Sequence, residues 1–199
     1  MVTGNHDLPR ISFGRTAEEL KLVFAFILAL PCVPLIYYGD EIGMKYEKIR
    51  NKDGGYCRTG SRTPMQWTDG KNAGFSNTEG ELYLPVYDNY KDINVAAQEA
   101  DASSLLNEVK KLVEIKRRYP ELFACGNELE VLSEGYPLVF SRTNEKEKLV
   151  CAVNPSDRDF TLDIKGGKIL TAVNVEMTGE TAALKAVSYL WMKVTKEEA

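Results

Sequence analysis

The run from Leu22 to Tyr38 carries no charged residue, and it constrains the fold more than any other part of the chain. It is marginally short for a membrane span, Pro31 and Pro34 interrupt it, and acidic residues flank it on both sides. It is also too long, and too far from the N-terminus, for a secretory signal. We therefore expect a buried helix followed by a buried strand.

The helix is predicted to begin at Thr16, which has capping-box spacing to Glu19, and to end at Pro31. Its apolar residues recur at helical spacing and give one broad apolar face: Leu20, Val23, Phe24, Ile27 and Leu28. The continuous apolar segment Val33–Tyr38 predicts a strand covered on both faces, as parallel strands are. Because Met1–Gly4 is typical of the end of another strand, we expect a strand–helix–strand unit whose two strands are parallel neighbours.

Two parallel strands are too few for a stable sheet, because parallel sheets need several strands and cover on both faces. Residues 45–100 offer no more such strands: they are rich in Gly, Asn, Asp and Tyr and show little periodicity, which is typical of a functional loop. A second helix is predicted from about Ser103 to Arg118, with basic residues in its last turns and Pro120 after it.

The rest of the chain alternates short apolar runs with turn residues, which predicts a small antiparallel β domain beginning near Asn127. The runs are 129–132, 138–142, 149–153, 160–164, 170–175 and 186–191. Trp191 falls within this alternation and is expected in the core.

The composition excludes several classes of protein. Lys plus Arg total 25 and Asp plus Glu total 29, so the net charge is −4, which does not suit a nucleic-acid backbone. The chain has one histidine and no CxxC pair, so a structural zinc site is excluded, and the cysteine pattern favours a reducing, cytoplasmic setting. The cysteines are Cys32, Cys57, Cys125 and Cys151, of which the first and last lie in apolar runs.

Asn5-His6-Asp7 follows the first predicted strand directly. Carboxylates and imidazoles at the carboxyl ends of parallel strands line the active face of (β/α)-barrels. From these residues alone, Asp7 as a loop cap and His6 as an ordinary surface residue explain the segment equally well.

Longer segments favour the first interpretation, because they resemble one family in the same order along the chain. They are Gly4–Arg10, which contains the NHD triplet, Pro34–Met44, Arg62–Trp67 with Asn72–Ser76, and Asn89–Val95. Together they resemble the α-amylase superfamily of glycoside hydrolases, in its α-glucosidase and oligo-1,6-glucosidase branch. The fold class that this implies is α/β plus all-β: residues 1–120 form the last two strand–helix units of a (β/α)8 barrel, and residues 121–199 form a small antiparallel β-sandwich domain.

The resemblance assigns roles to three residues. Asp7 resembles the family's third carboxylate, which holds sugar hydroxyls and stabilises the transition state. His6 resembles the imidazole that binds the same ring, and Arg58 resembles the arginine that reaches the glucose in the −1 subsite. These residue types suit an oxocarbenium-like transition state, which strengthens hydrogen bonds to the sugar's 2-hydroxyl.

Other polar and aromatic residues of these segments are expected to be structural: Arg10, Arg62, Gln66 and Trp67. Asp40 and Glu41 are not expected to be a catalytic pair, because adjacent residues that leave a strand point in opposite directions. Tyr87 and Tyr90 fit either stacking on sugar rings or packing of the loop.

The implied parent is a retaining α-glucosidase for maltodextrin or isomalto-oligosaccharides, or a transglycosylase of the same family. The resemblance implies an α-glucan partner and no cofactor for these residues, and it allows a calcium site only in barrel segments upstream. A retaining enzyme needs two carboxylates about 5 Å apart. In the family both precede the NHD segment, so we expect this chain alone to be inactive, and its exposed apolar surface to self-associate. A non-catalytic carbohydrate-binding or scaffolding module on the β domain is the alternative from another class.

Overall fold

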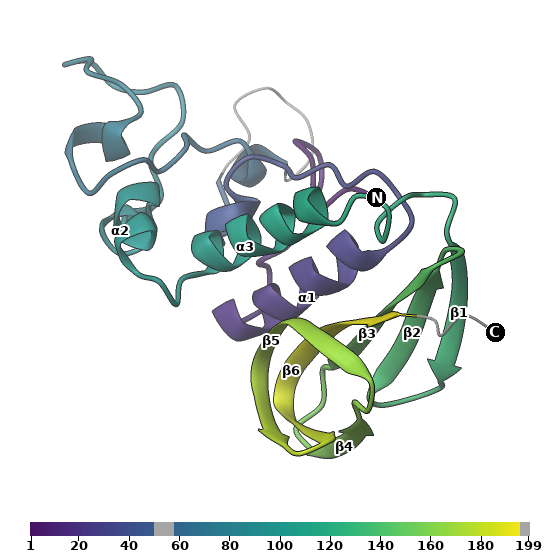
Figure 1. The fold of residues 1–199 in the computed structure, drawn as a ribbon. Helices are drawn as coiled ribbons and strands as arrows, with labels where there is room; N and C mark the ends of the chain where they lie inside the picture. The colour runs from purple at the N-terminus through teal and green to yellow at the C-terminus, as the bar shows by residue number, and fades with distance from the viewer. Residues whose placement is uncertain (50–57, 196–199) are drawn as a thin grey trace. The chain divides into compact units, whose positions relative to one another are not determined.

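The computed structural model describes residues 1–49 and 58–195 (Figure 1), so Cys57 lies outside the described residues. The chain divides into two compact units. One unit consists of Met1–Leu20 and Pro34–Lys110, and the other of Lys21–Val33 and the residues from Lys111 onward.

Helix α1 (Ala17–Ala29) begins with the predicted capping box. The backbone N–H of Thr16 donates to Glu19 Oε2 at 2.7 Å, and the N–H of Glu19 donates to Thr16 Oγ1 at 3.2 Å. The helix ends before Pro31, as expected. Its fully or almost fully buried apolar residues include four of the five predicted ones: Leu20, Phe24, Ile27 and Leu28. No helix in the described part of the chain combines the length and apolar character that a membrane span requires.

The segment Val33–Tyr38 differs from the prediction. Val2 and Leu35 form a single parallel bridge, in which Leu35 N donates to Met1 O at 2.9 Å, so the predicted parallel pairing is confirmed. A continuous buried strand is not formed, and Val33 and Leu35 are 70% and 60% exposed. The described residues place no other parallel strand beside this bridge, and parallel strands need neighbours and cover to bury their side chains.

The segment between this bridge and the second long helix is irregular, as predicted. Its described residues, 36–49 and 58–104, form only short helices: η1 (Asp40–Ile42), η2 (Thr59–Ser61), η3 (Lys71–Gly74), η4 (Asp88–Lys91) and α2 (Val95–Ala100). The side chain of Asn94 caps α2 by accepting from Ala97 N at 2.8 Å. Three buried residues of this segment pack with one residue of the second long helix in a small hydrophobic core, which consists of Ile42, Met44, Met65 and Leu106.

Helix α3 (Leu105–Arg118) has the predicted basic last turn and ends before Pro120. The hydroxyl of Ser104 accepts from Asn107 N at 3.2 Å and caps its first turn. One stripe of the helix is buried, including Leu112, which is completely inaccessible to solvent.

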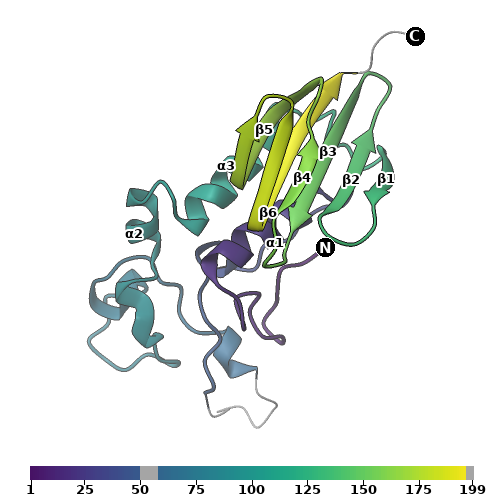
Figure 2. The same ribbon diagram turned by 90° about the horizontal axis from the view of Figure 1, so that it is seen from below.

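The remaining elements are β-strands, and each overlaps one predicted apolar run. They are β1 (Glu128–Ser133), β2 (Leu138–Thr143), β3 (Glu147–Asn154), β4 (Phe160–Asp163), β5 (Gly167–Thr178) and β6 (Thr181–Thr195). All their pairings are antiparallel, and β6 pairs with β3, β4 and β5 (Figure 2). The antiparallel pairing predicted for these runs is thus confirmed, and the described strands are joined in one hydrogen-bonded sheet.

The core of this sheet forms on one face of its long strands. Alternate residues of β6 point into it, and its members are Val139, Val150, Ala152, Ile164, Ala182, Leu184, Leu190 and Met192. Trp191 is also fully buried, as predicted, and its ring lies 5.1 Å from that of Phe123.

Candidate functional site

The NHD triplet forms a tight turn held by its own asparagine. Asn5 Oδ1 accepts from Asp7 N at 2.8 Å and from Leu8 N at 3.0 Å, as in an Asx turn. The turn leaves the neighbouring side chains open to ligands, since those of His6 and Asp7 are 66% and 42% exposed.

The carboxylate of Asp7 lies at the centre of a cluster of basic side chains. Its Oδ1 accepts from Arg58 Nη1 at 2.9 Å and from Arg62 Nη2 at 3.0 Å. Its Oδ2 lies 3.2 Å from His6 Nε2. The structure therefore brings together the three residues singled out in the sequence, although they come from segments about fifty positions apart.

These contacts fix the charge on Asp7. The hydrogen bond from Arg58 is the main cause that lowers the pKa of Asp7 below its ordinary value of 3.8, and Arg62 and His6 act in the same direction. Partial burial of the carboxylate opposes them. Asp7 is thus ionised at neutral pH, which suits a hydrogen-bond acceptor and a stabiliser of positive charge rather than a general acid.

Arg62 was expected to be structural and to pair loops, and its contacts agree with this expectation and name its partners. Besides its bond to Asp7, its Nε donates to the backbone oxygen of His6 at 2.9 Å. The hydroxyl of Ser61 also donates to Leu8 O. The four-residue spacing of Arg58 and Arg62 is the signal that could have indicated a shared partner, because the short helix η2 between them turns both toward Asp7.

Arg10, three residues after Asp7, belongs to a buried ion pair with Asp40. Arg10 and Asp40 are both inaccessible, and Arg10 Nη1 donates to the backbone oxygen of Tyr38 at 2.6 Å. Asp40 Oδ2 accepts from the hydroxyl of Thr3 at 2.7 Å. Asp40 therefore has its partners in the protein interior, and it does not form an exposed carboxylate pair with Glu41.

Gln66 and Trp67, both expected to be structural, have different environments. Gln66 is fully buried and its Nε2 donates to Asn89 Oδ1 at 3.2 Å, as a structural residue would. Trp67 is 49% exposed and lines a cavity, so the expectation that it packs in the interior is wrong. The backbone N–H of Trp67 donates to Ala73 O, and its backbone carbonyl accepts from Ala96 N. These two bonds fix the backbone with the indole at the surface. Tyr87 and Tyr90 are partly buried.

In the described residues, no group of three or more His, Cys, Asp or Glu side chains is arranged to hold a metal ion. The cluster around Asp7 instead offers one carboxylate, two guanidinium groups and one imidazole. These groups can together accept from and donate to the hydroxyls of a polar, uncharged ligand.

Comparison with known proteins matches the family model "Alpha amylase, catalytic domain" to residues 1–125. The chain is 34% identical over 185 residues to a probable oligo-1,6-glucosidase 2 of Bacillus subtilis, covering 75% of this chain and 33% of that protein. It is 34% identical over 203 residues to the trehalose synthase/amylase TreS of Mycobacterium tuberculosis, covering 91% of this chain and 32% of that one. The chain thus spans about a third of the length of these curated relatives.

The fold has similar counterparts among solved structures. The trehalose-6-phosphate hydrolase of Bacillus licheniformis superposes with a TM-score of 0.80 at 24% identity, covering 98% of this chain and 43% of that one. At this level of identity the match shows a shared fold.

Proposed function

Because this chain belongs to the α-amylase family, we propose that its Asp7 cluster holds a glucosyl ring at the bond cleaved by a retaining α-glucosidase. The observation that carries this proposal is the ionised carboxylate of Asp7, fixed by Arg58 and Arg62 and still 42% exposed. A fixed negative charge stabilises the oxocarbenium-like transition state, and hydrogen bonds to the ring hydroxyls strengthen as it forms.

Each residue of the cluster has a distinct part in this proposal. Asp7 accepts hydrogen bonds from ring hydroxyls and faces the positive charge that develops on the sugar. His6 donates to the same ring, and Arg58 keeps Asp7 ionised and reaches the glucose. Arg62 positions the turn, because it binds both Asp7 and the backbone of His6.

The substrates proposed for the whole protein are maltodextrins or isomalto-oligosaccharides. In its architecture, residues 1–120 would belong to a (β/α)8 barrel, and residues 121–199 would form a β-sandwich. Retaining hydrolysis needs two carboxylates about 5 Å apart as nucleophile and acid/base, and among the described residues Asp7, proposed here as a third carboxylate, is the only carboxylate in its cluster. We therefore expect no hydrolysis of p-nitrophenyl α-glucoside by the 199 residues alone, and measurable turnover would contradict this.

The chain contains one histidine, which provides a direct test of sugar binding. Titration with methyl α-glucoside should shift the imidazole proton signals of His6 in an NMR spectrum, because His6 lies beside Asp7. The Asp7→Asn variant should lose the shift, since it loses the negative charge and its hydrogen bonds from the arginines are no longer ion pairs. An acyclic polyol, sorbitol, serves as the control ligand and should leave the signals unchanged.

An outcome in which methyl α-glucoside shifts His6 equally in the wild type and in Asp7→Asn would contradict the proposal. The variant Glu134→Gln is a matched control, because it also neutralises one exposed carboxylate but lies in the other unit.

Transglycosylation is a second candidate function for the whole protein. Its support is the 34% identity to a trehalose synthase/amylase over 91% of the chain. The same residues would hold the sugar in both reactions, and access of water to the intermediate would decide between them. Product analysis with maltose separates the two, since hydrolysis yields glucose and transfer yields a new disaccharide.

A reducing compartment such as the cytoplasm remains our proposal for the protein's location. Cys32, Cys125 and Cys151 are free thiols, which supports it, because disulfides form and persist mainly in oxidising compartments. Fractionation of cells followed by thiol labelling would test it.

A further inference from the structure

The short helix η2 separates the two arginines that bind Asp7. Arg58 stands directly before it and Arg62 directly after it, and the backbone N–H of Arg62 donates to Thr59 O at 3.0 Å. Both guanidinium groups donate to the same carboxylate oxygen, Asp7 Oδ1. Because two positive charges that share one acceptor repel each other, their joint approach to Asp7 depends on where η2 is held.

Ser61, the last residue of η2, connects this helix with two other segments. Its hydroxyl donates to Leu8 O, in the chain directly after Asp7. Its backbone oxygen accepts from the hydroxyl of Tyr37 at 3.1 Å. Ser61 is fully buried, so water does not reach its end of these two hydrogen bonds and cannot replace the partners.

Tyr37 is itself held by several neighbouring groups. Its backbone N–H donates to Thr3 Oγ1 at 2.9 Å, and that hydroxyl donates to Asp40 Oδ2 at 2.7 Å. Its ring centroid lies 4.7 Å from that of Tyr38 and 5.4 Å from the guanidinium carbon of Arg10. Burial raises the pKa of the Tyr37 hydroxyl to about 12, so the group stays an uncharged hydrogen-bond donor at neutral pH.

The middle residue of η2 also has little freedom to move. Gly60 lies against the backbone of Glu47, whose N–H donates to Gly60 O at 3.4 Å. A Cβ atom at Gly60 would overlap the backbone oxygen of Glu47, so only glycine permits this approach. Contacts at two of its three residues, Gly60 and Ser61, thus fix η2 in place.

From these contacts we propose that Tyr37 and Ser61 are positioning residues, which hold η2 so that Arg58 and Arg62 converge on Asp7. In this assignment both residues act on the site through the two arginines, and neither has to touch the sugar. The inference rests on the proposed function for its ligand, but the positioning itself can be measured on the Asp7 carboxylate without a ligand.

The pKa of Asp7 reports the positioning directly. Tyr37→Phe removes only the hydroxyl that binds Ser61 O, so the arginines should hold Asp7 less well and its pKa should rise toward the ordinary value of 3.8. Ser61→Ala removes the bond to Leu8 O and should act in the same direction. Carbon-13 NMR of the aspartate carboxyl groups measures both. A purely structural role would lower the melting temperature and leave the pKa of Asp7 unchanged, which would overturn the assignment.

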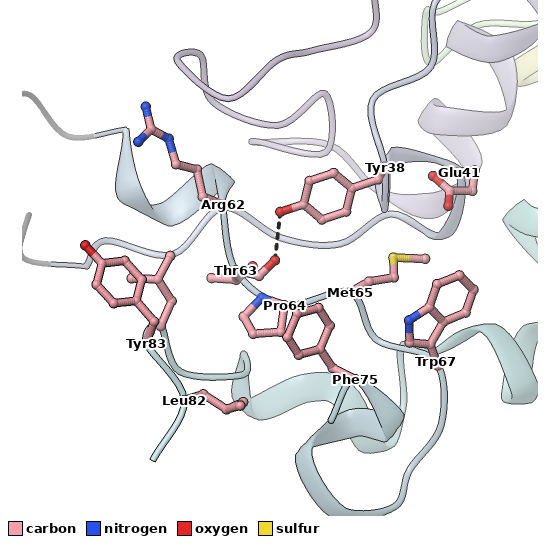
Figure 3. A pocket seen from close by; sticks show the side chains of 11 residues that line it. Tyr38, Glu41, Arg62, Thr63, Pro64, Met65, Trp67, Phe75, Leu82 and Tyr83 are labelled. Carbon is pink, nitrogen blue, oxygen red and sulfur yellow. Dashed lines mark hydrogen bonds between the residues drawn. The ribbon is translucent and has the colours of Figure 1, made fainter. Parts of the chain in front are cut away.

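Tyr38→Phe is the matched control. The hydroxyl of Tyr38 also donates to a backbone oxygen, that of Thr63, at 2.9 Å (Figure 3). Thr63 comes after both arginines in the sequence, and Figure 3 shows the guanidinium group of Arg62 pointing away from Tyr38. Tyr38→Phe therefore removes a similar hydrogen bond and should leave the pKa of Asp7 as it is. An equal rise in Tyr37→Phe and Tyr38→Phe would contradict the proposal.

A double variant shows whether Tyr37 acts through the arginines. Arg58→Gln removes the group that makes the largest contribution to the lowered pKa of Asp7. Tyr37→Phe added to it should raise this pKa less than Tyr37→Phe does alone, because one of the two positioned groups is already absent. Equal rises in the two backgrounds would mean that Tyr37 acts on Asp7 by another route, and the positioning role would be wrong.

Sugar binding separates this inference from the proposed function. If the His6 signals respond to methyl α-glucoside, Tyr37→Phe and Ser61→Ala should each weaken its affinity about three- to tenfold, and Tyr38→Phe should not. If the wild type binds no sugar while the pKa of Asp7 still rises in the first two variants, the proposed function is wrong and the positioning stands. If those two variants match the wild type in both affinity and the pKa of Asp7, the positioning is wrong and the proposed function stands.

Discussion

Arg10 and Asp40 form an ion pair that solvent does not reach, with 3.6 Å between Arg10 Nη1 and Asp40 Oδ1 and both side chains fully buried. The guanidinium group also lies over the rings of Tyr37 and Tyr38, at 5.4 and 4.9 Å from their centroids. Arg10 follows the turn that contains Asp7, and Asp40 follows the segment that pairs with Val2. The pair therefore links the chain that follows the Asp7 turn to the segment that pairs with Val2.

Removal of one partner of this pair should be strongly destabilising. Asp40→Asn leaves the positive charge of Arg10 buried without a counter-ion, and we expect a loss of about 3 kcal/mol in the free energy of unfolding. Urea denaturation followed by circular dichroism measures it.

The double variant Arg10→Met with Asp40→Asn provides the control, because it removes both charges together. It should be less destabilised than the sum of the two single variants. Additive losses would show that the two residues stabilise the fold independently, contrary to the geometry.

The ion pairs of Asp7 predict a specific dependence of stability on pH. The pKa of Asp7 is lowered in the folded state, chiefly by Arg58, so the ionised form is favoured there. The contribution to stability is therefore complete above the ordinary pKa of 3.8 and is lost as the pH falls through the lower folded value. The difference in urea midpoint between the wild type and Asp7→Asn should shrink to nothing on acidification.

The two arginines should differ in their effect on this titration. Arg58→Gln should raise the pKa of Asp7 more than Arg62→Gln does, because the hydrogen bond from Arg58 is the largest single cause of its shift. Carbon-13 NMR of the aspartate carboxyl groups measures both values. Equal pKa values in the two variants, or a larger rise in Arg62→Gln, would contradict the assignment.

The start of α1 offers a local test of stability. Thr16→Ala removes the hydroxyl that accepts from Glu19 N, and we expect a loss of about 1 kcal/mol. Thr16→Ser keeps the hydroxyl and should cost much less, as measured by thermal unfolding. The capping box also lowers the pKa of Glu19, mainly through the hydrogen bond from the N–H of Thr16.

The features that were predictable from the sequence depend on local or periodic patterns. The capping box at Thr16 involves residues three positions apart, and each strand of the sheet follows an alternation that the local sequence contains. The positions of His6, Asp7 and Arg58 were indicated by resemblance rather than by spacing. Their meeting confirms that the segments are neighbours in space, while their roles stay a proposal.

The features that were missed depend on partners far away in the sequence. Arg62 reaches Asp7 across an irregular segment, so its partner could not be predicted, and only its four-residue spacing from Arg58 could have indicated that the two arginines share one. Trp67 has an apolar side chain that favours burial in any sequence-based estimate, but bonds to Ala73 and Ala96 hold its backbone with the ring at the surface. Leu35 lies in a segment whose composition is typical of a buried strand. Its burial requires neighbouring strands that the described residues do not supply.

The exposed side of the parallel bridge predicts self-association of the 199-residue chain. Leu35 is 60% exposed and Val2 is 49% exposed, so a second copy could cover both. We expect dimers or larger species in sedimentation velocity experiments, together with binding of a hydrophobic dye. Leu35→Glu should shift the chain toward the monomer and reduce dye binding, because a charge at this position opposes burial. Met177→Glu, at a residue 43% exposed at the end of β5, should leave both unchanged. A wild-type chain that sediments as a single monomer and binds no dye would contradict the prediction.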